Sequence, residues 1–281
     1  MHPELFSIGP LTIRSYGLML ATGFMAGIFV AARRARKAGE NPDHIYNLSV
    51  WIVLSSLVGA RIYYVLTHFQ EFRVLGDMSF ARRIFLELKN MFWPVGAGGQ
   101  IGISGLILYG GLIAATAVAV IYLRVHRLNV LQFTDFLAPS LGLGEFFTRI
   151  GCFLNGCCYG TPTDSCVGVV FPHESAAGFY FPQTPIHPAQ LYNSFAGLTI
   201  FFLLLFLERY KKFDGFTSLM YFTLYATGRF TIDFFRYYEK KMIVFGLSQN
   251  QIISIVVFVV SVSLLILFSK RTAGSIQKEH N

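Results

Sequence analysis

Long apolar stretches separated by short polar segments dominate the pattern of hydrophobic and polar positions along the chain. A helix needs roughly 20 mostly apolar residues to cross a bilayer, and seven stretches approach that length. The fourth is the least regular, because three charged residues and Pro139 interrupt it. The pattern predicts an all-α integral membrane protein with about seven transmembrane helices, near residues 16–32, 48–66, 107–123, 131–150, 188–207, 216–235 and 250–268.

Basic residues follow the first, third, fifth and seventh stretches, so all four groups would lie on one side of a membrane crossed seven times. Lysine and arginine in short loops mark the cytoplasmic side. We therefore expect the N-terminus outside, the C-terminus in the cytoplasm, and outer loops at residues 67–106, 151–187 and 236–249. The four groups are Arg33, Arg34, Arg36 and Lys37; Arg124 and Arg127; Arg209, Lys211 and Lys212; and Lys270 and Arg271.

One outer loop carries the basic segment FARRIFLELKNMFW at residues 80–93, in which charged, aliphatic and aromatic positions alternate at roughly helical spacing. Such a pattern is typical of an amphipathic helix in the membrane interface, although an ordinary basic loop is the alternative. Only 14% of the 281 residues are charged, so the net charge of +8 is not evidence for nucleic-acid binding. We expect one transmembrane domain over residues 1–281, with an amphipathic arm at 67–106, an outer head loop at 151–187 and a flexible tail at 270–281.

Four arginines, Arg61, Arg149, Arg229 and Arg236, lie within or at the ends of the apolar stretches. A charge at bilayer depth is costly unless it is paired or hydrated, so each is a functional candidate. A guanidinium group grips phosphate oxygens with two hydrogen bonds and keeps its charge when desolvated. The arginines predict a site for a phospholipid headgroup or another anion near the outer leaflet. Arg61 and Arg236 would also suit snorkelling anchors.

In the sixth stretch, Tyr225, Arg229, Asp233 and Arg236 follow one another at spacings of four, four and three residues. Residues at this spacing share one face of a helix. Arg229 and Asp233 can therefore pair, which lowers the cost of burying both. A functional anion site and a purely structural ion pair remain alternative interpretations.

Other polar candidates stand near predicted outer ends of helices. His187 precedes Pro188, a residue that suits a first helical turn, with Gln190 and Tyr192 following. His187 could relay protons or bind an anion, or simply cap the helix. Tyr109, which precedes a glycine pair, and Tyr16 fit either a binding role or an aromatic belt.

The cysteines Cys152, Cys157, Cys158 and Cys166 permit several interpretations. Their order, C-x4-C-C-x7-C, departs from the paired C-x2-4-C spacings of zinc sites, and adjacent side chains point apart in most backbones, so we expect no metal. A disulfide from Cys166 to Cys157 or Cys158 is compatible with an oxidising outer face. A reactive thiol would need a lowered pKa, which Arg149 could provide.

The ordered segments resemble those of the prolipoprotein diacylglyceryl transferases, bacterial inner-membrane enzymes with seven spans and an outer N-terminus. The resemblance covers most of the chain and rests on IRSYGLMLATGF, VGARIYYVL, YGGLIA, DFLAP, RIGCFLNGCCYG, HPAQLY and GRFTIDFFR. It implies transfer of a diacylglyceryl group from phosphatidylglycerol to a cysteine thiol in the lipobox of a preprolipoprotein. A thioether forms and glycerol phosphate leaves, without a cofactor. It also implies the inner membrane, an active site toward the outer leaflet, and contact with membrane lipids; we expect a monomer.

Carried over by position, the resemblance implies that Arg149 and Arg229 hold the phosphate. Tyr16 and Asn155 would position the headgroup, and Tyr109 or His187 would handle protons. Gly160, Arg61, Gln190 and Tyr192 match family positions as well.

The signature usual in the family is G-R-x-G-N-F-x-N-x-E-x-x-G. Here Thr148, Cys152 and Cys157 replace its first glycine, its first asparagine and its glutamate; Tyr109 replaces a histidine, and Asn193 a glutamate. These departures leave open a related transferase with a lipid or glycan acceptor. The membrane arginines would also suit a lipid-binding or transport protein, and the cysteines would suit a thiol redox membrane protein.

Overall fold

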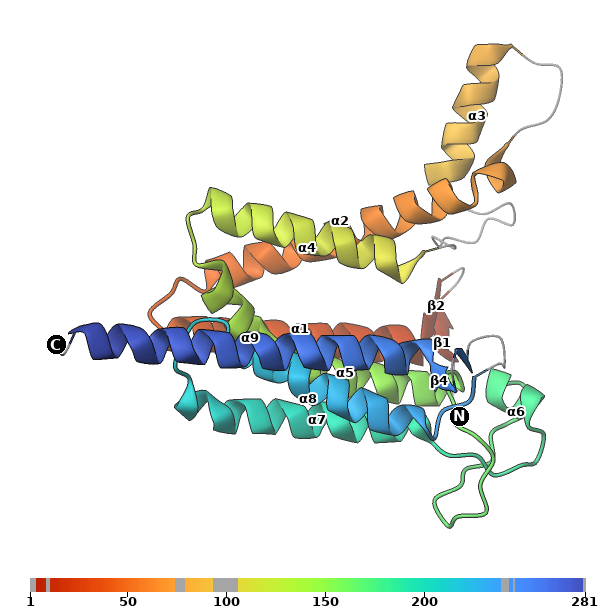
Figure 1. Cartoon of the computed structure of the whole chain (residues 1–281). Helices are drawn as coiled ribbons and strands as arrows, with labels where there is room; N and C mark the ends of the chain where they lie inside the picture. Colours follow the sequence, from red (N-terminus) through yellow and green to blue (C-terminus); the bar gives the residue numbers. More distant parts are fainter. Residues whose placement is uncertain are drawn as a thin grey trace. The chain divides into compact units, whose positions relative to one another are not determined.

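The computed structural model describes residues 4–8, 11–73, 79–92, 106–238, 243–244 and 246–279 (Figure 1). The chain forms two compact units. The first comprises residues 1–6, 13–40 and 131–281, and the second comprises residues 7–12 and 41–130. Within the described ranges, each unit consists mainly of long helices.

The helices of the first unit approach closely where small residues face each other. Ser140 of α5 donates a hydrogen bond to the carbonyl oxygen of Gly27 in α1, at 2.7 Å. A Cβ atom on Gly142 of α5 would lie 2.9 Å from the carbonyl oxygen of Gly197 in α7. Small residues permit such contacts between apolar helices, which have no hydrophobic driving force to associate in lipid. The helices are α1 (Ser15–Lys37), α5 (Val130–Asn155), α7 (Ala189–Leu207), α8 (Phe216–Asp233), which packs against α7 and α9, and α9 (Gln249–Glu279) (Figure 1).

Short elements complete the first unit. The head loop that follows α5 folds over a small core of Phe171, Ala177 and Ile186 and contains the short helix α6 (Ala176–Tyr180). Figure 1 shows α6 at the end of the unit where α1 begins. The remaining elements are the turn η2 (Glu208–Tyr210) and the hairpin β3 (Ile243–Val244) and β4 (Leu247–Ser248). The paired strands β1 (Glu4–Ile8) and β2 (Leu11–Arg14) contain residues of both units.

Far from the head loop, Asp135 in the first turns of α5 is 1% exposed. Its carboxylate accepts hydrogen bonds from the backbone N–H groups of Gly215 (2.8 Å) and Ser218 (2.9 Å) at the start of α8. Lys211 pairs with it at 3.1 Å. A carboxylate at a helix N-terminus satisfies free N–H groups and complements the helix dipole. This polar interruption of the fourth stretch therefore joins α5 to α8.

The second unit is built around two packed helices, α2 (Asp43–Thr67) and α4 (Leu108–Val125), with the turn η1 (Phe69–Phe72) and the helix α3 (Phe80–Phe92). A Cβ atom on Gly59 would lie 2.5 Å from the carbonyl oxygen of Gly110, and one on Gly110 would lie 2.4 Å from that of Gly59. Backbones this close tolerate only glycine at both positions.

The all-α membrane class is confirmed, since all seven predicted stretches fall in helices. Among the described residues, five helical segments are long and apolar enough to span a membrane: Ser15–Lys37, Asp43–Thr67, Leu108–Val125, Ala189–Tyr210 and Gln249–Thr272. The helices α5 and α8 carry more polar residues. Seven spans and the sides of the two termini therefore stay predictions.

Segment 80–93 forms α3 up to Phe92, whereas its place in the membrane interface stays a prediction. The boundaries of the single domain, arm, head loop and tail are likewise predictions. Parts of the predicted outer loops and tail (residues 74–78, 93–105, 239–242, 245 and 280–281) lie outside the described residues, as do 1–3 and 9–10.

Candidate active site

Most of the candidate residues meet at one end of the first unit, where α5 ends, α7 begins and α8 ends. Helix α5 stops at Asn155 because Gly156 adopts a positive φ of 71°, which reverses the chain into the head loop. Gly160 then pairs with Arg236 as an isolated bridge. The head loop is thereby attached to the segment that follows α8.

Gly160 occupies a position where no side chain fits. A Cβ atom there would lie 2.5 Å from the carbonyl oxygens of both His187 and Phe235. The N–H of Gly160 donates to the carbonyl oxygen of His187 at 3.0 Å, and the N–H of Thr161 donates to that of Phe235 at 3.0 Å. The predicted importance of this glycine has a steric reason, since it lets the start of α7 and the end of α8 approach the same segment of the head loop.

Arg149 forms an ion pair within its own helix. Its Nε donates to Oε1 of Glu145, one helical turn earlier, at 2.7 Å, and both side chains are more than four-fifths buried. Within the described part of the chain, Glu145 is the only side chain hydrogen-bonded to Arg149, and it contacts Nε alone. The two terminal nitrogens of the guanidinium fork, which suit phosphate, are not engaged by that carboxylate.

Arg229 lies in a more complete network. It is 8% exposed and pairs with Oδ1 of Asp233 at 3.2 Å. Its terminal nitrogens also donate to Oδ1 of Asn193 in α7 at 3.5 Å and to the hydroxyl of Tyr238 at 3.1 Å. The spacing on the sixth stretch therefore predicted the Arg229–Asp233 pair correctly, although the other two partners were not foreseen.

Asp233 also connects α8 with the start of α9. Its carboxylate accepts hydrogen bonds from the Tyr238 hydroxyl at 2.6 Å and from the Ser248 hydroxyl. Ser248 and Gln251 cap α9 reciprocally: the Gln251 N–H donates to Ser248 Oγ at 3.1 Å, and the Ser248 N–H donates to Gln251 Oε1 at 2.9 Å. The S-x-x-Q sequence of a capping box was the available signal for this joint.

The predicted residues at the start of α7 support the head loop. His187 Nδ1 and the Tyr192 hydroxyl are hydrogen-bonded at 3.0 Å. Gln190 is fully buried, and its Nε2 donates to the carbonyl oxygen of Cys157 at 2.8 Å. Among the described residues, no donor reaches Oε1 of Gln190.

Tyr225 and Tyr16 both lie near the polar end of α5. Tyr225 stacks on Tyr221, with ring centres 5.7 Å apart, and lies within electrostatic range of Arg149, Arg229 and Arg236. Tyr16 packs against Gly151, where a Cβ atom would meet the Tyr16 backbone at 3.1 Å. The guanidinium of Arg236 lies over the Tyr238 ring at 5.4 Å.

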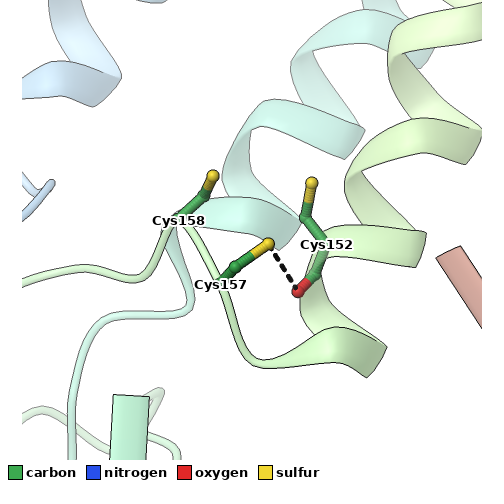
Figure 2. A group of neighbouring side chains, drawn as sticks. All are labelled: Cys152, Cys157 and Cys158. Carbon is green, nitrogen blue, oxygen red and sulfur yellow. Dashed lines mark hydrogen bonds between the residues drawn. The ribbon is translucent and has the colours of Figure 1, made fainter. Parts of the chain in front are cut away.

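Three of the four cysteines gather at the end of α5 (Figure 2). The sulfur atoms of Cys152, Cys157 and Cys158 all lie within 4.8 Å of one another, and all four cysteines are free thiols. Hydrogen bonds from the Cys152 and Cys157 thiols lower the pKa of Cys158, and the positive charges of Arg236 and Arg149 lower it further. Cys166 is exposed in the head loop and is not part of this group.

Two predicted residues belong to the second unit. Arg61 donates from Nε to the carbonyl oxygen of Met91 (2.6 Å) and from a terminal nitrogen to that of Asn90 (3.3 Å). It therefore caps the last turn of α3. Tyr109 is 61% exposed at the start of α4. Phospholipid binding by Arg61 and proton transfer by Tyr109 stay predictions.

The chain is similar to known proteins over most of its length. Residues 3–267 match the sequence profile of the family described as Prolipoprotein diacylglyceryl transferase. A phosphatidylglycerol–prolipoprotein diacylglyceryl transferase of Clostridium tetani is 29% identical over 93% of this chain and 96% of its own length. Proteins with that activity in their names from Clostridium perfringens (92% of both chains) and Campylobacter hominis (96% of this chain, 92% of its own) are each 32% identical. The chain belongs to the prolipoprotein diacylglyceryl transferase family.

Proposed function

We propose that the protein transfers the diacylglyceryl group of phosphatidylglycerol to the cysteine thiol of a prolipoprotein lipobox. The reaction forms a thioether and releases glycerol phosphate. The names of relatives that match over more than nine-tenths of this chain support both substrates. The embedded arginines support the same chemistry independently of those names.

The observation that carries the proposal is the excess positive charge around Tyr225. The carboxylate of Glu145 and the guanidinium groups of Arg149, Arg229 and Arg236 all lie within electrostatic range of its hydroxyl. Two of the three guanidinium groups have a carboxylate partner on their own helix, which leaves one positive charge in excess. A purely structural ion-pair network needs no such excess. An anionic phosphate that gains charge as it leaves would be stabilised by it.

The two central arginines differ in what they can offer a phosphate. Arg229 already donates to Asp233, Asn193 and Tyr238, so it acts mainly through its charge and by fixing α8 against its neighbours. Arg149 bonds Glu145 through Nε and presents its fork of terminal nitrogens. We assign phosphate contact to Arg149 and field stabilisation to Arg229. Arg236 stays a predicted binding residue, and the snorkelling alternative for it is still open.

Proton handling falls to His187 in this proposal, because His187 belongs to the same unit as Arg149. In the tautomer whose Nδ1–H donates to the Tyr192 hydroxyl, the ring is held through Nδ1 and Nε2 is free to accept a proton from the acceptor thiol. Gln190 holds the backbone of the loop that carries Cys157, and Asn155 and Tyr16 flank the same loop. These positions are suited to orienting the glycerol headgroup.

The donor and acceptor are tested together by mass spectrometry of products. Purified protein is incubated with vesicles of phosphatidylglycerol or phosphatidylethanolamine and a lipobox peptide that contains either cysteine or serine. We expect a diacylglyceryl thioether only from phosphatidylglycerol and the cysteine peptide. A lipid or glycan product with no peptide product would establish the alternative acceptor class, and unchanged lipid would favour a binding or transport protein.

Location and assembly form part of the same proposal. The distribution of basic residues supports the inner membrane with the head loop outside, which would expose the active site to phospholipids of the outer leaflet. A monomer is part of the same proposal. A single-chain mass in detergent that retains transferase activity is the expected result.

A further inference from the structure

The three-cysteine group lies beside the proposed phosphate site, and the reaction outlined above assigns it no role. Cys152 is 5% exposed, whereas Cys157 and Cys158 are partly exposed at the start of the head loop. Figure 2 shows the three side chains gathered between the end of α5 and the turn that follows it. Positive charges from Arg149 and Arg236 lie within electrostatic range of the group.

An unusual backbone brings these thiols together. The sequence argued against a metal site because adjacent cysteines normally point apart. Here Gly156 and Cys158 have φ angles of 71° and 61°, and the second value is uncommon for any residue other than glycine. Holding a non-glycine residue there is energetically unfavourable, and such strain concentrates at functional sites. The turn removes this objection, whereas the C-x4-C-C-x7-C order still departs from the paired C-x2-4-C spacings of zinc sites.

We propose that Cys152, Cys157 and Cys158 form a three-thiolate zinc site whose fourth position takes the thiol of the acceptor. Zn²⁺ binds cysteine sulfur tetrahedrally at about 2.3 Å, and its catalytic sites keep three protein ligands and one open position. Sulfur atoms in that geometry are about 3.8 Å apart. Because all three lie within 4.8 Å, small side-chain rotations would bring them to bonding positions.

The surroundings suit such a site. Three thiolates and one Zn²⁺ carry one net negative charge, which the nearby guanidinium groups of Arg149 and Arg236 would offset. Gln190 fixes the ligand loop by donating to the carbonyl oxygen of Cys157. Hydrogen bonds of this kind orient metal ligands in other proteins.

This inference rests on the proposed function and supplies what that function needs, a deprotonated acceptor thiol. The acceptor thiol would bind the open position and lose its proton to His187 Nε2, since a thiol that coordinates zinc is deprotonated. Its sulfur would then attack the glyceryl carbon that carries the phosphate ester. The carbon–sulfur bond forms while the carbon–oxygen bond breaks, and the electron pair leaves with glycerol phosphate.

Cobalt substitution tests the site without relying on activity. Reduced protein in detergent is titrated anaerobically with Co²⁺, whose tetrahedral thiolate complexes absorb strongly in the near ultraviolet and visible. We expect saturation at one equivalent, and Zn²⁺ added afterwards should abolish the bands. Cys152→Ser, Cys157→Ser and Cys158→Ser should each weaken Co²⁺ binding at least tenfold, whereas Cys166→Ser should bind normally.

Thermal unfolding midpoints identify variants that keep the fold, and only those are compared. Three results would each overturn the site. They are an absence of thiolate bands in the reduced protein, bands that survive in folded variants of the three cysteines, and a disulfide between two of these cysteines after purification under reducing conditions. The lipobox peptide should shift the Co²⁺ bands when it contains cysteine and not when it contains serine. An identical spectrum with both peptides would overturn the assignment of the open position.

Activity separates this inference from the proposed function. We expect a chelator to lower diacylglyceryl transfer at least tenfold and Zn²⁺ to restore it. Full transfer by metal-free protein would overturn the zinc site and leave the proposed function standing. A thiol-dependent Co²⁺ spectrum without any diacylglyceryl product would overturn the proposed function and leave the metal site standing.

Discussion

Removing the Asp233 carboxylate tests whether the network at the end of α8 holds the first unit together. In Asp233→Ala, Arg229 keeps its charge in a position that is 8% exposed, and the hydroxyls of Tyr238 and Ser248 lose their acceptor. Breaking a buried ion pair by removing one partner typically costs about 3–5 kcal/mol. At roughly 2–4 °C per kcal/mol for a chain of this size, the unfolding midpoint should fall by about 6–20 °C.

The assay is thermal unfolding in detergent, followed by intrinsic fluorescence at several heating rates so that irreversible aggregation is recognised. A double-mutant cycle gives the sharper result. Arg229→Met combined with Asp233→Leu leaves no unpaired charge, so the double variant should be at least about 1 kcal/mol more stable than the sum of the two single losses predicts. A loss of stability below about 1 kcal/mol in Asp233→Ala, or strictly additive losses in the cycle, would show that the Arg229–Asp233 pair does not hold the first unit together.

Three further changes have expected outcomes of their own. Gly160→Ala places a Cβ atom 2.5 Å from two backbone oxygens and should lower stability by about 1–3 kcal/mol, whereas Gly17→Ala, in open space, should be neutral in the same unfolding assay. Asp135→Ala should destabilise the protein by about 3–5 kcal/mol, because it removes the N-terminal cap of α8 and breaks a buried ion pair. The matched variant Asp214→Ala, at a more exposed position, should cost under about 1 kcal/mol. Equal losses of stability in thermal unfolding would contradict the capping role of Asp135. Cys166, exposed in the head loop, should react with a membrane-impermeant maleimide added to spheroplasts, and labelling only after the membrane is broken would reverse the predicted topology.

Periodicity predicted the helices and one side-chain pair of the candidate site. All seven apolar stretches are helical, and the four-residue spacing of Arg229 and Asp233 correctly placed them in contact. Glu145 and Arg149 pair at the same four-residue spacing, although Glu145 was expected only to interrupt an apolar stretch. A helical i,i+4 relation depends on local geometry alone, so it can be predicted from sequence whenever the helix is recognised.

The rest of the site depends on contacts between distant segments. Arg229 bonds Asn193 in α7 and Tyr238 beyond α8, and Asp233 bonds Ser248 before α9. No period in the sequence determines which of these polar residues meet, because tertiary packing brings the segments together.

The grouping of the cysteines was equally beyond a pattern argument. It requires a positive φ at Cys158. Cysteine disfavours this conformation, so the residue type gives no indication of it. The sequence indicated a chemically unusual segment, and the backbone at that turn determined which thiols lie together.

The central claim is that Arg149 contacts the phosphate of the leaving group, and the rate of diacylglyceryl transfer in Arg149→Lys tests it most directly. Lysine keeps the positive charge but loses the two-nitrogen fork, and removing one preplaced transition-state donor typically lowers kcat by about 10²–10³-fold. We expect a loss of that size with phosphatidylglycerol and a lipobox peptide, while the exposed Arg124→Lys stays at the wild-type rate. A wild-type rate in Arg149→Lys, with the unfolding midpoint unchanged, would show that the Arg149 fork does not stabilise the leaving phosphate.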